Sequence, residues 1–274
     1  MAVRKILAAA GVVAGLLGFA GGSHAAIVKT DIIMIVDESG SMGSVQANLR
    51  NNIGLFASIL SGGGVDAQYG LVGYGNGSVV PRMLTDLTTA GGFATAASGL
   101  VASGGTEPAF TASAFALNAL DNQTSLFSFR SDALKNIIIF TDEPSNGDTI
   151  ARGAVNGSAV TFSTVDQLLT DNNALYNAVL SGTSTISSIG GLATAHSGQV
   201  FNLQLFNTTD QLQIETFVTD FANAKLQETL DFCRQNPNAP GCQGVRTVPA
   251  PGTLALLGLG FTGLGMLRRR KLLV

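Results

Sequence analysis

The chain has 274 residues, of which 46% are apolar, 12% are charged and 34 are glycine. This size and composition can bury one sizeable core, so we expect one domain with appended segments. Six positive charges lie in the terminal segments, at Arg4, Lys5 and residues 268–271, and without these six the formal charge of −3 becomes −9. Phosphate binding needs clustered Lys and Arg, which excludes nucleic acid as an expected partner.

Residues 1–25 have the pattern of an export signal. Arg4 and Lys5 charge the start, residues 6–20 are apolar, and residues 23–25 are small enough for a signal peptidase. A buried first strand is the alternative, which the charged start and the small-residue end disfavour. We expect cleavage after Ala25 or Ala26, followed by export through the inner membrane.

The next segment predicts a strand, a loop and a helix. Residues 30–36 form an apolar, β-branched run typical of a buried parallel strand. Apolar positions in residues 44–60 recur at steps of three or four, which predicts an amphipathic helix. The loop between them carries Asp37, Ser39 and Ser41. Loops at the carboxyl ends of strands are where open α/β sheets bind ligands.

Two further oxygen-bearing residues occupy equivalent places. Thr106 follows a Gly-rich loop and precedes a helical run at residues 109–120, while Asp142 ends a second buried-strand pattern at residues 135–141. If these strands are central and parallel, all three loops open on one sheet edge. Helix caps and ordinary turns are the alternative explanation for such Ser, Gly and Asp residues.

The five residues Asp37, Ser39, Ser41, Thr106 and Asp142 form a hard, all-oxygen set. Two carboxylates and three hydroxyls suit Mg²⁺, Mn²⁺ or Ca²⁺ and argue against zinc or copper. We expect the adjacent Glu38 and Glu143 to be solvated or to support the ligands. Asp31 and Asp86 are interpreted as strand-start and turn residues.

The remaining pattern predicts alternating strands and helices. We expect strands at residues 67–74, 79–84, 183–189 and 200–205, and helices at residues 93–101, 162–180 and 210–232. Gly75, Asn76 and Gly77 predict a hairpin between the first two of these strands.

The metal-ligand pattern resembles that of the von Willebrand factor type A domain. The family motif, Asp-x-Ser-x-Ser with a distant Thr and a distant Asp, is matched at every position, and the resemblance extends over residues 27–232, including residues 193–201. It implies a doubly wound, mostly parallel, Rossmann-like α/β sheet flanked by helices, which we place at residues 26–232. It also implies that the three hydroxyls bind the metal and that Asp37 and Asp142 act directly or through water.

Cys233 and Cys242 are the only cysteines, and a turn-forming segment separates them. An exported protein meets an oxidising compartment, so we expect a disulfide that closes a linker at residues 233–247.

Residues 248–274 resemble a PEP-CTERM sorting tail of Gram-negative bacteria. A short motif of Val248, Pro249, Ala250 and Pro251 precedes an apolar stretch at residues 252–267 and the basic residues Arg268, Arg269 and Arg270. Ala250 stands where the family motif has its central Glu. The resemblance implies transient anchoring in the inner membrane, an exosortase-type sorting enzyme, and release to the cell surface or extracellular matrix. A simple transmembrane tail anchor is the alternative.

Three functions fit these features, in decreasing order of support. In the first, an ion held by mostly neutral hydroxyls accepts a carboxylate from a protein partner, which makes the chain a metal-dependent adhesion module. In the second, the metal stabilises a structural surface or matrix protein. The third is a metal-dependent hydrolase, but His196 is the only histidine after signal removal and no nucleophile and base pair is evident, so we do not expect an enzyme.

Overall fold

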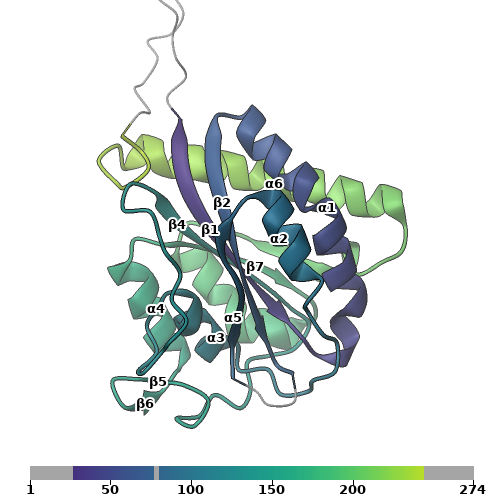
Figure 1. Cartoon of the computed structure of the whole chain (residues 1–274), viewed down its shortest axis with the longest axis vertical. Coiled ribbons are helices and arrows are strands. Elements are labelled where there is room, and N and C mark those ends of the chain that lie inside the picture. Colours follow the sequence, from purple (N-terminus) through teal and green to yellow (C-terminus); the bar gives the residue numbers. More distant parts are fainter. Residues whose placement is uncertain (1–26, 77–79, 244–274) are drawn as a thin grey trace, which may run out of the picture.

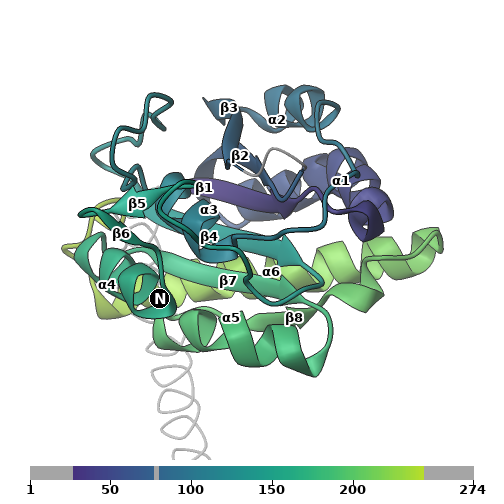
Figure 2. The same ribbon diagram turned by 90° about the horizontal axis from the view of Figure 1, so that it is seen from below.

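The computed structural model describes residues 27–76 and 80–243, which form one six-stranded sheet between two layers of helices (Figure 1). The strands lie in the order β3, β2, β1, β4, β7, β8, which Figure 2 shows from one edge to the other. Their bounds are β1 Val28–Asp37, β2 Val65–Tyr74, β3 Arg82–Thr88, β4 Leu134–Thr141, β7 Leu175–Leu180 and β8 Val200–Asn202. All neighbours pair in parallel except β3, which is antiparallel to β2.

Helices cover both faces of the sheet. One face carries α1 (Gly43–Gly62), α2 (Ala90–Ala97) and α6 (Gln211–Gln235), and the other carries α3 (Ala109–Ala116), α4 (Phe162–Asp171) and α5 (Thr183–Ala195). Shorter elements are the 3-10 turns Gly40–Met42 and Leu203–Leu205 and the small hairpin of β5 (Ala154–Val155) and β6 (Ser158–Ala159). The predicted doubly wound α/β fold is therefore confirmed.

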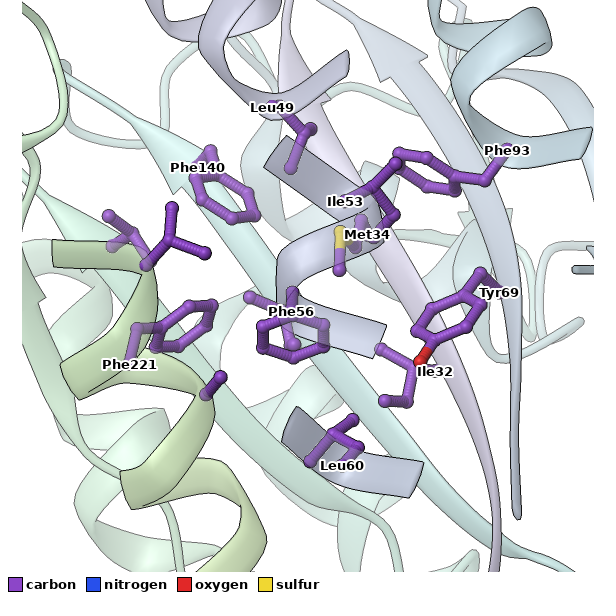
Figure 3. Packing of buried hydrophobic residues seen from close by; sticks show 14 of the residues in the cluster. Ile32, Met34, Leu49, Ile53, Phe56, Leu60, Tyr69, Phe93, Phe140 and Phe221 are labelled. Atoms are coloured by element: carbon purple, nitrogen blue, oxygen red, sulfur yellow. The ribbon is translucent and has the colours of Figure 1, made fainter. Parts of the chain in front are cut away.

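Strand β1 lies at the centre and supplies side chains to both cores. Ile32 and Met34 point into the layer that contains Phe56 of α1 and Phe221 of α6 (Figure 3). The alternate residues, such as Ile33, pack in the opposite core with α3, α4 and α5. Side chains of a strand alternate between faces, so burial on both sides explains why residues 32–36 of β1 are continuously apolar.

The largest error of the sequence prediction concerns residues 162–180, which are not one helix. Helix α4 ends at Asp171, Asn173 adopts a left-handed conformation with φ of 47°, and β7 follows as a fully buried strand beside β4. A short apolar run at the end of a helical pattern does not reveal its period, and the pairing with β4 decides it.

The predicted strand at residues 183–189 is also wrong, since this segment begins helix α5. Its β-branched residues favour a strand locally, but Ile189, Leu192 and Ala193 together bury one helical face against β7. Tertiary packing thus overrides the local preference.

The other predicted elements are present with shifted bounds. The antiparallel pairing of β2 and β3 is confirmed, β3 runs from Arg82 to Thr88, and the predicted turn lies partly outside the described residues. Helix α6 begins after Asp210, whose carboxylate caps the helix, and continues to Gln235, so Cys233 lies within the helix. The predicted disulfide between Cys233 and Cys242 is formed and buried.

The described ends of the chain meet at the amino end of β1, where the Lys29 amide donates to the Gly241 carbonyl at 3.1 Å. Within residues 27–76 and 80–243, no helix combines the length and apolar character needed to cross a bilayer. The predicted signal at residues 1–25, the sorting tail at residues 248–274 and the proposed tail anchor lie outside the described residues.

Candidate metal centre

The predicted motif at the end of β1 is organised around the carboxylate of Asp37, which is fully buried. The Ser39 amide donates to Asp37 Oδ1 at 2.7 Å, and the Thr141 hydroxyl at the end of β4 donates to Oδ2 at 2.8 Å. Ser39 Oγ lies 3.2 Å from Ser41 Oγ. The turn therefore places one carboxylate and two hydroxyls together, with Ser41 exposed to solvent.

The loop that carries Thr106 is joined to this turn through the backbone. Ser39 and Gly104 form an isolated parallel bridge, and the Ser103 and Gly104 amides donate to the Glu38 carbonyl at 2.9 and 3.0 Å. A Cβ atom built on Gly75 would stand 3.2 Å from Asp37 Oδ1 and 3.5 Å from the Thr106 carbonyl oxygen. The second predicted loop thus reaches the first.

Asp142 follows β4, whose neighbour in the sheet is β1. The Thr185 hydroxyl of α5 donates to its backbone carbonyl at 3.0 Å, which fixes the turn. The Asp142 carboxylate is close enough to raise the pKa of Asp37. The parallel sheet therefore brings all three predicted loops to one edge, as expected.

The sequence model of the von Willebrand factor type A domain matches residues 31–215. The chain belongs to this family. A second match, to the PEP-CTERM protein-sorting motif, covers residues 247–271.

Solved structures support the fold of this type A domain. Two crystal forms of proximal thread matrix protein 1 from the mussel byssus are similar to it, with TM-scores of 0.50 and 0.51 and sequence identities of 16% and 14%. Each match covers 73% of this chain and 47% or 49% of the byssus protein, so the chain spans about half the length of those structures. Identity this low shows the fold alone. Comparison with curated proteins gave no match.

Two carboxyl groups of the type A domain carry raised pKa values. Burial raises the pKa of Asp37 to about 6, against the lowering effect of the Ser39 and Thr141 hydrogen bonds, and the Asp142 charge adds to the rise. Burial and then the Asp37 charge raise the pKa of Glu107 to about 7, and the adjacent Glu143 carboxylate acts in the same direction. Negative charge is therefore crowded at this edge of the sheet.

The unsatisfied polar atoms provide a test of whether these residues fit a cation. Five buried side-chain atoms in the described part of the chain have no hydrogen-bond partner, and three of them belong to Tyr74, Glu107 and Asp142. Buried polar groups are normally paired, so their concentration here favours a bound ion with its waters. No three acidic, His or Cys side chains among the described residues are grouped closely enough to hold a metal. Two carboxylates with three hydroxyls need no such group, and the donor set fits a hard divalent cation.

Sequence reasoning missed several residues that support the centre. Thr141 was interpreted only as part of a strand, and Glu107 was assigned no role. Glu38 was expected to be solvated or to support the ligands; the structure excludes the solvated alternative, because the side chain is fully buried, forms an ion pair with Arg82 and accepts the Val101 amide at 3.0 Å. Its pairing with a distant residue could not be seen from local sequence.

Proposed function

We propose that this chain is an exported, surface-associated protein-binding domain that uses Mg²⁺, Mn²⁺ or Ca²⁺ to coordinate a carboxylate of a protein partner. The convergence of Asp37, Ser39, Ser41, Thr106 and Asp142 on one sheet edge carries this proposal. The hydroxyls of the two serines and Thr106 would hold the ion, together with the two carboxylates acting directly or through water.

The solvent exposure of the centre and the positive charge of a bound ion both favour binding of a carboxylate from another molecule. Ser41 is exposed and Thr106 is half-buried, so the edge opens to solvent. A divalent ion with mostly neutral ligands remains electrophilic, and that is the property the ion supplies when bound. The protein residues fix the ligand positions and keep the buried carboxylate of Asp37 oriented by two donors.

The sorting motif supports surface presentation. The match at residues 247–271 implies export and processing by an exosortase-type system. The described chain leaves the domain near Lys29, at the amino ends of the parallel strands, whereas the candidate centre lies at their carboxyl ends. A domain held through its tail would therefore present the centre away from its attachment point.

Binding of metal and partner can be tested together. We expect the wild type to bind Mg²⁺ in calorimetry and to retain a matrix protein in a pull-down, with chelator abolishing retention. Asp37→Ala should lose both, whereas Asp171→Ala, which removes an exposed carboxylate at the end of α4, should lose neither. If chelator releases the partner but Asp37→Ala still retains it, the proposal is wrong.

A structural role is the second candidate, because a cation would also satisfy the unpartnered buried atoms at the centre. In that case metal would raise the melting temperature strongly while no partner is retained. We propose binding rather than catalysis, since His196 lies at the end of α5 and contacts Asp166 of α4 instead of the site residues. Turnover abolished by Asp142→Ala would contradict this.

A further inference from the structure

Glu107 directly follows the candidate ligand Thr106 and is only 1% exposed. Asn146 holds it at three points: its Nδ2 donates to Glu107 Oε2 at 3.0 Å, its Oδ1 accepts the Glu107 amide at 3.2 Å, and its own amide donates to the Glu107 carbonyl at 2.9 Å. This triple contact fixes both the backbone and one carboxylate oxygen. Glu107 is therefore held in place by the loop that follows Asp142.

The Glu107 side chain lies near Asp37. A Cβ atom built on Gly75 would lie 3.4 Å from Glu107 Cγ and 3.2 Å from Asp37 Oδ1, so both groups border the same small volume. The second carboxylate oxygen, Oε1, is buried without a hydrogen-bond partner, as is the nearby Tyr74 hydroxyl. Among the ion pairs of the described chain, none includes Glu107.

A buried carboxylate without a positive partner is unfavourable because it loses hydration without gaining an attraction. A cation at the adjacent centre would provide that attraction, and burial would limit its screening by salt. Glu107 would therefore act on the ion through its charge, from the position that Asn146 fixes.

We propose that Glu107 determines the cation affinity of the centre by placing a third negative charge beside Asp37. This inference rests on the proposed function, because it requires a cation at the five predicted ligands. In this proposal Glu107 acts on the ion through its charge, and the three hydrogen bonds with Asn146 hold that charge in place.

Three variants separate charge from shape. Glu107→Gln keeps the side-chain size and removes the charge, whereas Glu107→Asp keeps the charge and shortens the side chain. Asp171→Asn removes the charge of an exposed carboxylate at the end of α4 and is the matched control. The full chain, purified in detergent and freed of metal, would be titrated with Mg²⁺ by calorimetry and with Mn²⁺ by electron paramagnetic resonance.

We expect Glu107→Gln to weaken cation binding about 10-fold or more, in the range found when groups behind metal ligands are removed. Glu107→Asp should lose less affinity than Glu107→Gln, and Asp171→Asn should differ little from the wild type. Equal affinity of Glu107→Gln and wild type would overturn the inference, as would a larger loss in Glu107→Asp than in Glu107→Gln. If the wild type itself binds no cation, the proposed function fails first.

Discussion

Gly104 and Gly75 meet backbone to backbone, because a Cβ atom on Gly104 would overlap the carbonyl oxygen of Gly75. This contact joins the loop after β2 to the loop that carries Thr106. The same Gly104 donates its amide to the Glu38 carbonyl at 3.0 Å, next to the motif at the end of β1. The packing of these three chain segments therefore requires a residue without a side chain at position 104.

Gly104→Ala should displace the Thr106 loop, since the overlap is with rigid backbone. We expect a loss of stability of about 1 to 3 kcal/mol, the usual cost of overpacking, and a clear loss of Mg²⁺ affinity. Gly105→Ala is the control: a Cβ there would meet no atom within 4 Å, so stability should change by less than about 0.5 kcal/mol. Urea unfolding and calorimetry measure both effects, and equal behaviour of the two variants would contradict the prediction.

The raised pKa of Asp37 predicts opposite pH dependences for the metal-free and metal-loaded states. Because the folded pKa of about 6 exceeds the ordinary aspartate value of 3.8, the metal-free fold binds a proton more tightly than the unfolded chain and loses stability as pH rises through about 6. Cation binding requires the carboxylate form, so Mg²⁺ affinity should fall as pH drops below about 6.

Asp37→Asn removes this carboxylate at nearly constant side-chain size, and with it the charge that raises the pKa of Glu107. Relative to that variant, the metal-free wild type should lose about 2 to 3 kcal/mol of stability between about pH 4 and pH 7. Thermal or urea unfolding in chelator, measured across this range, provides the test. A stability difference that does not change with pH would show that Asp37 titrates normally.

The ion pair of Lys225 and Glu228 on α6 is buried against the sheet. Lys225 Nζ lies 2.5 Å from Glu228 Oε1, which also accepts from Asn177 Nδ2 of β7 at 3.0 Å, and burial lowers the pKa of Lys225. Lys225→Met should lower the free energy of unfolding by roughly 3 to 5 kcal/mol, because it leaves Glu228 buried and unpaired.

The double variant Lys225→Met with Glu228→Gln should recover most of that loss, since the glutamine is neutral and keeps an acceptor for Asn177. Guanidinium unfolding of the single and double variants makes the comparison. A double variant as unstable as Lys225→Met alone would mean that packing around Lys225, rather than the unpaired charge, determines the cost.

The disulfide between Cys233 and Cys242 closes a short loop whose Gly241 carbonyl accepts the Lys29 amide. Replacing both cysteines by Ala should cost about 2 to 3 kcal/mol by the loop-entropy relation. Mg²⁺ affinity should not change, because the loop lies at the sheet edge opposite the candidate centre. Denaturant unfolding of the variant and of the reduced wild type should agree, and a variant as stable as the oxidised wild type would contradict this role.

The sequence predicted the elements that have strong local signals and missed those that depend on partners. Residues 32–36 and 137–140 are continuously apolar because β1 and β4 are buried on both faces, and their β-branched content and short length indicated strands. Residues 175–180 and 183–195 were misassigned, because their short apolar runs fit either a strand or a helix. The pairing of β7 with β4 and the packing of α5 on β7 settle these assignments.

By itself, the sequence determined the chemistry of the candidate centre: two Asp carboxylates and three hydroxyls, each placed after a strand or a Gly-rich loop. Residue type and local spacing suffice for that, because side-chain oxygens are read directly and strand ends follow from hydrophobic period. Only the tertiary structure decided that Glu107 is buried beside Asp37, that Thr141 orients the same carboxylate, and that Glu38 is paired with Arg82. Burial and long-range pairing are set by how strands align in the sheet, which local sequence does not encode.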